Sequence, residues 1–177
     1  MRIVSGKYGG RTLLEFKGDK VRPTLDKVRE SLFNIIAPKI MGASFCDLFC
    51  GTGAVGIEAL SRGAKKVVFT DNSKASIDLT KKNLEKLKIF DVEVSFCDSI
   101  KFLQTTKEKF DFVFIDPPYK TDLGVEALKI ISERDVLEED GLIIFESEDK
   151  KQVDFLTEVD QRKYGRAILS FYKKGEL

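Results

Sequence analysis

The chain has 177 residues, of which 42% are hydrophobic and 33% are charged. This length fits one domain with a sizeable apolar core, and a second full domain is not expected. No apolar run is long enough to span a membrane, and residues 1–6 do not form a secretion signal. The sequence therefore predicts a cytoplasmic protein.

The sequence contains no histidine, which excludes Ser-His and Cys-His catalysis and disfavours a catalytic transition-metal site. Its three cysteines, Cys46, Cys50 and Cys97, match no zinc or redox spacing and are interpreted as reduced core residues. No metal is predicted. Any chemistry must depend on carboxylates, backbone groups and a cofactor.

Positive charge is concentrated at the amino end, although the net charge is only +1. Residues 1–29 hold eight Lys or Arg and three Asp or Glu. A basic segment joined to a mildly acidic body favours a polyanion docked beside the rest of the domain. The alternative is an ordinary solvated surface.

Residues 2–14 predict two short β segments around a glycine-rich turn, with Lys7 and Arg11 near its tip. Such a turn lacks bulky side chains and can lie close to a phosphate backbone. A helix is expected next, with Thr24 as its N-cap and with Pro38 and Gly42 ending it. Its predicted apolar face consists of Leu25, Val28, Leu32, Ile35 and Ile36.

From Ala43 onward, short apolar runs alternate with segments of helical spacing. This alternation predicts a parallel sheet covered by helices on both faces. The clearest helix spans residues 73–87, with Asn72 or Ser73 as its cap. The last two strands are expected to form an antiparallel hairpin. The expected strands are 44–49, 66–70, 92–96, 112–116, 141–146, 157–164 and 166–173.

A strand, a glycine turn and a helix follow one another around Gly51, Gly53 and Gly56. With Asp71 ending the next apolar run, the spacing matches a dinucleotide fingerprint, so a NAD-dependent oxidoreductase is one alternative. Asp47 argues against it, because an acid just before the turn would repel a pyrophosphate and hold an amine. S-adenosylmethionine carries such an amine.

A second motif, Asp-Pro-Pro-Tyr at residues 116–119, follows an apolar strand. Because the carboxyl ends of parallel strands share one edge, Asp116 should face the same crevice as Gly51 and Asp71. Pro117 and the proline after it lack N–H groups and present only carbonyl acceptors, while Tyr119 can stack on a base. This environment suits an exocyclic amine. The alternative is a proline turn with a capping Asp.

Both motifs carry a resemblance to known families. The pattern Asp-x-Phe-x-Gly-x-Gly resembles the first motif of S-adenosylmethionine-dependent methyltransferases, which implies that Asp47, Gly51 and Gly53 hold the cofactor. The same resemblance implies that Asp71, with Asn72 beside it, binds the ribose. Asp98 matches the acid that accepts from the adenine amine, although it could equally cap a helix. The peptide at 116–119 resembles the amino-methyltransferase signature. Pyrimidine-carbon methyltransferases instead use a cysteine there, and none is present.

The order of segments along essentially the whole chain resembles the RsmD family of bacterial 16S ribosomal RNA guanine-N2 methyltransferases. The segments are residues 2–6, Gly10-Arg11, 22–24, 28–34, the glycine motif, 116–119, 162–165 and 170–172. The resemblance implies an α/β, Rossmann-like methyltransferase fold with a mostly parallel seven-stranded sheet. It divides the single domain, 1–177, into a basic RNA-binding extension, 1–42, and a catalytic core, 43–177.

The implied reaction is methylation of the N2 amine of one guanine in 16S ribosomal RNA, within a small-subunit assembly intermediate that carries ribosomal proteins. Asp116 and the Pro117 carbonyl would polarise the amine, and Tyr119 would stack on the base. A monomer is expected. The remaining alternative is a DNA adenine-N6 methyltransferase, but about 40 residues before the first core strand leave little room for a DNA-recognition region. The expected phosphate contacts are Arg2, Lys7, Arg11 and Arg22.

Overall fold

The computed structural model describes residues 1–17, 23–118 and 120–175. Two positions with expected roles, Arg22 and Tyr119, lie outside the described residues. Across the described part of the chain, no helix is both long and apolar enough to cross a membrane.

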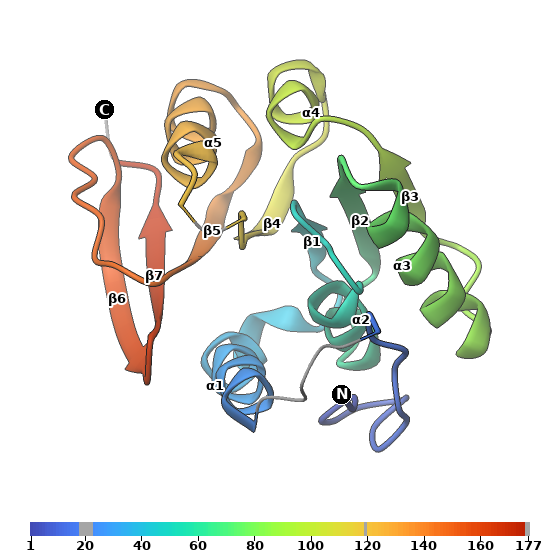
Figure 1. Ribbon diagram of the computed structural model, residues 1–177. Helices are drawn as coiled ribbons and strands as arrows, with labels where there is room; N and C mark the ends of the chain where they lie inside the picture. Colours follow the sequence, from blue (N-terminus) through green and yellow to red (C-terminus); the bar gives the residue numbers. More distant parts are fainter. Residues whose placement is uncertain (18–22, 119, 176–177) are drawn as a thin grey trace.

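Seven strands form one sheet in the order β3-β2-β1-β4-β5-β7-β6 (Figure 1). Strands β1 to β5 run parallel, and β7 is antiparallel to both β5 and β6. This arrangement confirms the predicted fold class and the predicted carboxyl-terminal hairpin. The strands are β1 (Ser44–Asp47), β2 (Lys66–Asp71), β3 (Glu93–Phe96), β4 (Phe110–Ile115), β5 (Leu137–Ser147), β6 (Thr157–Tyr164) and β7 (Ala167–Lys173).

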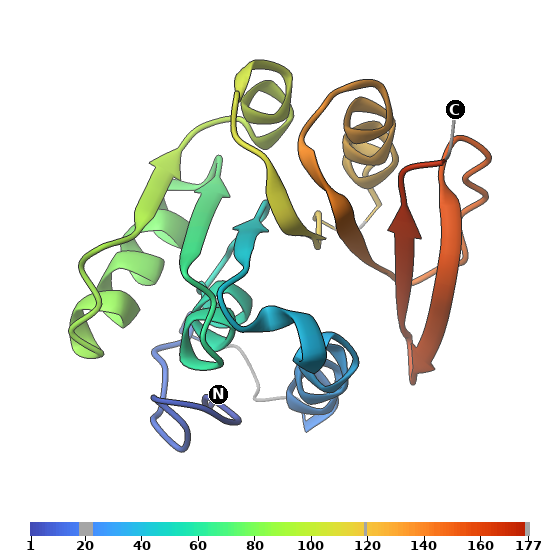
Figure 2. The ribbon, with the colours of Figure 1, turned by 180° about the vertical axis from the view of Figure 1, so that it is seen from behind.

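Helices cover both faces of the sheet, as Figures 1 and 2 show from opposite sides. On one face, α4 and α5 pack on an apolar cluster that includes Val113 and Ile143. On the other face, α1, α2 and α3 pack on a second cluster that includes Phe45 and Phe112. The helices are α1 (Pro23–Ile40), α2 (Ala54–Ser61), α3 (Lys74–Lys86), α4 (Ser99–Thr105) and α5 (Leu123–Glu133).

Helix α1 differs from its predicted limits at both ends. It begins at Pro23 rather than after a Thr24 cap, and proline is well suited to a first helical position because the N–H it lacks has no partner there. It also continues through Pro38 to Ile40. In the last turn a proline removes only one helical hydrogen bond, so the helix ends two residues later, just before Gly42, which has a φ of 75°.

The amino-terminal segment, residues 1–14, forms less sheet than predicted. Its only bridge is antiparallel, between Arg2 and Thr12, around the glycine turn. Ile3 and Leu13 are nevertheless buried in the cluster that α1, α2 and α3 share. The segment is thus packed into the domain by its apolar residues rather than by a strand ladder.

Candidate active site

Acidic side chains gather where the parallel strands end. Asp47 closes β1, Asp71 closes β2, Asp116 follows β4, and Glu146 lies next to the end of β5. The strand order reverses between β1 and β4, and ligands of open α/β sheets bind at such a reversal. A cavity of about 170 Å³ opens there. Its lining includes Met1, Arg29, Asp47, Cys50, Gly51, Thr52, Phe114, Asp116 and Glu146.

The glycine turn between β1 and α2 needs its glycines for three different reasons. Gly51 has a φ of 54°, and a Cβ there would meet nothing within 4 Å, so its open side can admit a ligand. Gly53 has a φ of 78°, and a Cβ would lie 2.8 Å from the Thr80 methyl carbon. A Cβ at Gly56 would lie 2.3 Å from the Phe69 ring, so this third glycine lets α2 pack on the sheet.

Asp47 is only 1% exposed and lines the cavity. Its Oδ2 accepts a hydrogen bond of 2.9 Å from the Gly56 N–H, in the first turn of α2. Burial raises the pKa of Asp47 to about 7; the Gly56 hydrogen bond opposes this, and the charges of Asp116 and Asp71 add to it. No cationic group of the described residues pairs with it. A buried acid in this setting favours a positively charged ligand.

Asp71 is held rigidly at the end of β2. Its two oxygens accept from the N–H groups of Gly51, at 3.0 Å, and Ser73, at 2.8 Å. Each oxygen keeps a further lone pair for a ligand hydroxyl. The cap of α3 is Ser73, whose Oγ accepts from the Ser76 N–H, and the neighbouring Asn72 is exposed.

Asp98 caps helix α4, because its Oδ1 accepts from the N–H groups of Ile100, at 2.8 Å, and Lys101, at 3.0 Å. It lines a separate open hollow beside the end of β3, together with Phe96 and Phe102, and does not line the cavity of Asp47. The capping alternative is therefore observed. Its other oxygen makes no hydrogen bond to any described residue, so a second role toward a ligand stays compatible with the cap.

Asp116 and Glu146 lie side by side. Phe114 pairs with Ile144 in the parallel register of β4 and β5, and both acids come two residues later. Burial raises the pKa of each carboxyl, and the charge of Asp116 raises that of Glu146 further. The sequence analysis missed Glu146. The sequence pattern that could have identified Glu146 is the one that identified Asp116, namely an acid directly after a run of four apolar residues.

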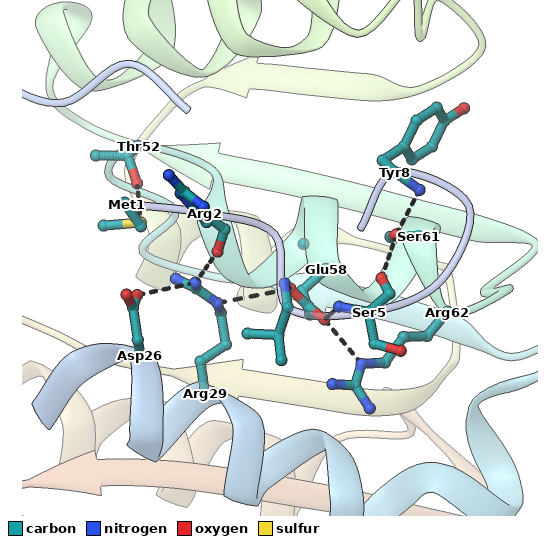
Figure 3. Close-up of polar contacts among 12 residues, drawn as sticks. Met1, Arg2, Ser5, Tyr8, Asp26, Arg29, Thr52, Glu58, Ser61 and Arg62 are labelled. Atoms are coloured by element: carbon teal, nitrogen blue, oxygen red, sulfur yellow. Dashed lines mark hydrogen bonds and ion pairs between the residues drawn. The ribbon is translucent and has the colours of Figure 1, made fainter. Parts of the chain in front are cut away.

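The amino-terminal segment is tied to α2 by Glu58, a fully buried acid (Figure 3). Glu58 accepts from the N–H groups of Val4, at 2.8 Å, and Ser5, at 3.0 Å, and from Nε of Arg62, at 2.8 Å. Nε of Arg29 lies 3.7 Å from the same carboxylate. The sequence analysis also missed this cluster, because buried charge pairs follow no local pattern.

Arg29 joins three parts of the molecule. Its guanidinium donates to the Arg2 carbonyl and, at 3.0 Å, to Asp26 within α1 (Figure 3). It also lines the cavity, together with Met1. The first residues of the chain therefore border the cavity itself.

The predicted RNA-contacting residues that the structure describes are exposed. Lys7 and Arg11 flank the Tyr8 ring, with their charged groups 5.4 and 5.7 Å from its centre. The turn between them presses on the end of α2, where Ser61 Oγ accepts from the Tyr8 N–H at 2.9 Å. Arg2 is exposed at the base of the same loop.

Comparison with known proteins identifies the family. The model of a family described as conserved hypothetical protein 95 matches residues 1–173. Ribosomal RNA small subunit methyltransferase D of Haemophilus influenzae is 39% identical over 85% of this chain and 80% of its own length. The chain belongs to the RsmD family. Family membership makes it a methyltransferase and argues against the oxidoreductase alternative.

Two further relatives, a putative ribosomal RNA methyltransferase and a putative methyltransferase, match nearly the whole chain. YlbH of Bacillus subtilis is 37% identical over 98% of this chain and 99% of its own length. The solved structure of yhhF from Escherichia coli has a TM-score of 0.88 and 32% identity, covering 98% of this chain and 97% of that one. The amino-terminal segment and the carboxyl-terminal hairpin thus lie within the region that this chain shares with both relatives.

Proposed function

We propose that this methyltransferase transfers a methyl group from S-adenosylmethionine to the N2 amine of a guanine in 16S ribosomal RNA. The observation that carries the proposal is the shared cavity, where Asp116 borders the same space as Asp47 and the open side of Gly51. A place for an amine-bearing cofactor thus adjoins a hydrogen-bond acceptor for the substrate amine. The name of the Haemophilus influenzae relative supports ribosomal RNA as the substrate.

The residues around the glycine turn fit S-adenosylmethionine. Gly51 and Gly53 would let the backbone approach it, and the buried Asp47 carboxylate would hold its amino group. The fixed carboxylate of Asp71, with Asn72 beside it, would accept from the ribose hydroxyls. Asp98 would accept from the adenine amine through its free oxygen. When bound, the cofactor supplies a methyl group on a positively charged sulfur.

The acceptor edge after β4 would prepare the guanine. The N2 lone pair is delocalised into the ring, and hydrogen bonds from the amine to Asp116 and the Pro117 carbonyl favour the tetrahedral form that attacks a methyl group. Because its pKa is raised, Asp116 is also suited to take up the proton that the methylated amine releases. Tyr119, outside the described residues, would stack on the base.

Residues 1–42 would form the RNA-binding extension of the catalytic core, 43–177. Arg2, Lys7 and Arg11 are exposed in the segment whose first residue, Met1, lines the cavity, and they would contact phosphates, as would Arg22. RNA loops expose bases that can be extruded into a pocket. The proposed substrate is 16S ribosomal RNA in a cytoplasmic small-subunit assembly intermediate with ribosomal proteins, on which the enzyme acts as a monomer.

The substrate assignment is tested with labelled S-adenosylmethionine and three acceptors: undermethylated 30S particles, naked 16S RNA and duplex DNA. The expected product, identified by mass spectrometry of the digested nucleosides, is N2-methylguanosine in the particles. N6-methyladenosine in the duplex DNA would instead support the DNA methyltransferase alternative. Calorimetry provides the cofactor control, in which NADH should not compete with S-adenosylmethionine.

A further inference from the structure

Glu146 is a buried carboxyl group with no structural partner in the described part of the chain. Its side chain is 8% exposed, and none of the described residues makes a hydrogen bond or an ion pair with its carboxylate. It borders the cavity of Asp47 and Asp116 on one side and the hollow behind Pro117 on the other. An unpaired acid is costly to bury, so its position beside the methyl-transfer site calls for a ligand.

The pairing of β4 with β5 sets where Glu146 points. Phe114 and Ile144 are paired and belong to the same apolar cluster, which α1 covers. Side chains two residues apart in a strand share a face, so Asp116 and Glu146 emerge on that face at neighbouring places. Arg29, which lines the same cavity, donates to Asp26 and to the Arg2 carbonyl instead. Two acceptor groups thus stand next to each other over one cavity.

Guanine and adenine differ in the hydrogen-bonding groups that they would present to two adjacent carboxylates. Guanine presents an N1–H donor next to its N2 amine, whereas adenine presents a bare N1 acceptor next to its amine. A carboxylate can accept two parallel hydrogen bonds from N1–H and one N2–H, which leaves the other N2 hydrogen to be shared by Asp116 and the Pro117 carbonyl. Against adenine, the same carboxylate would face the lone pair of N1. We propose that Glu146 selects guanine by accepting from its N1–H and one N2–H.

This inference rests on the proposed methylation of a guanine amine and goes beyond it by naming the residue that reads the base. Glu146 lines the cavity that a bound base would fill, so the base displaces water from its carboxylate, and a base without N1–H then leaves that carboxylate unpaired. In the ligand-free protein, burial and the charge of Asp116 raise the pKa of Glu146 to about 8. The N1–H and N2–H donors of a bound guanine stabilise the carboxylate form and would lower this pKa again.

The test uses 2-aminopurine, which keeps the N2 amine but has no hydrogen on N1. Small-subunit particles are reconstituted on 16S RNA with either guanine or 2-aminopurine at the methylated position, and kcat/KM is measured for both. The parent enzyme should prefer guanine by roughly ten- to hundredfold, the usual discrimination of a bidentate base contact. In Glu146→Gln, the amide can donate to N1 of 2-aminopurine and accept from N2, so the preference should fall at least about tenfold.

Two controls separate the possible failures. Glu139→Gln, an exposed position in the same strand, should keep the parent preference, and Glu146→Gln should bind S-adenosylmethionine as the parent does. An unchanged preference in Glu146→Gln, while the parent still methylates guanine, would overturn the role of Glu146 alone. A parent that methylates no guanine would overturn both proposals. If Glu146→Gln does not fold, the test depends on the parent enzyme alone. Equal kcat/KM values of the parent on guanine and on 2-aminopurine would refute the proposal that the N1–H is recognised.

Discussion

Asp47 is a buried acid whose state should change the stability of the ligand-free protein with pH. Its pKa is raised to about 7, so the folded state holds a proton that the unfolded state has released. The contribution of Asp47 to the free energy of unfolding should therefore fall as pH rises from about 4 to about 7, by up to about 1.4 kcal/mol per pH unit.

Urea unfolding of the parent and of Asp47→Asn across this range checks the prediction. The difference between their free energies of unfolding should decline with rising pH and level off above pH 7. The control is Asp91→Asn, which replaces an exposed acid that forms no ion pair with any described residue. A parallel pair of curves for the parent and Asp47→Asn would mean that Asp47 titrates normally.

At the scale of single residues, the sequence predicted those site residues whose roles follow from local pattern. Gly51, Asp47 and Asp116 each stand directly beside an apolar strand, and the sheet brings them to one cavity. Glu58 and Arg29 could not be predicted, because their pairing joins α1, α2 and the first residues of the chain. Only the folded structure defines such distant partners.

Helix α2 anchors the amino-terminal segment through the Glu58 carboxylate. Removing this carboxylate should therefore release the segment from α2. Glu58→Ala removes the acceptor for the Val4 and Ser5 N–H groups and leaves Arg29 buried without its nearby acid. The expected loss in the free energy of unfolding is about 3 to 5 kcal/mol, the usual cost of breaking a buried pair. Urea unfolding measures it.

Limited trypsin digestion adds a local readout. Cleavage near Lys7 and Arg11 should become faster in Glu58→Ala under native conditions. Glu85→Ala, which removes an exposed acid from α3, should change neither stability nor cleavage. If the segment stays protected in Glu58→Ala, its apolar contacts through Ile3 and Leu13 hold it without the carboxylate.

At the scale of elements, periodicity predicted the order of strands and helices, but not how the amino-terminal segment packs. The glycines and charged residues around Gly6 are typical of an exposed hairpin that makes few contacts with the rest of a domain. In the structure, a Cβ at Gly6 would overlap the Ser61 carbonyl, at 1.9 Å. That close approach to α2 fixes the turn, and its cause lies more than 50 residues away in the sequence.

For the molecule as a whole, the exposed cations near the amino end should set how RNA binding depends on salt. Reversing Lys7 and Arg11 to Glu should weaken RNA binding and reduce the slope of log affinity against log salt by roughly 1.4 to 1.8, the value for two lost phosphate contacts. Cofactor affinity should not change. Binding titrations between 50 and 200 mM salt measure the slope.

The matched control reverses Lys107, which follows α4 in the chain, and Lys129, which lies in α5. Helices α4 and α5 cover the face of the sheet opposite to α1, α2 and α3 (Figure 1). These changes alter the net charge equally and should affect the slope much less. An equal effect of both pairs would place the RNA contacts elsewhere or indicate an effect of net charge alone.

The overall topology was predictable because each strand and helix repeats one local pattern, and the connections of a parallel sheet have few arrangements. The carboxyl ends of the strands then define the site without further information. The cavity's remaining walls, from Met1 and Arg29, depend on tertiary packing of the amino-terminal segment and α1, which no periodicity describes.

The central claim is that Asp116 prepares the substrate amine for methyl transfer, and single-turnover kinetics test it most directly. Asp116→Ala should fold, bind S-adenosylmethionine as tightly as the parent, and form N2-methylguanosine roughly 10²-fold or more slowly, the scale of losing one positioned polar group. Asp116→Asn keeps an acceptor oxygen and should retain partial activity. Parent rates in both variants would contradict the claim and leave Asp116 as a structural residue at the end of β4.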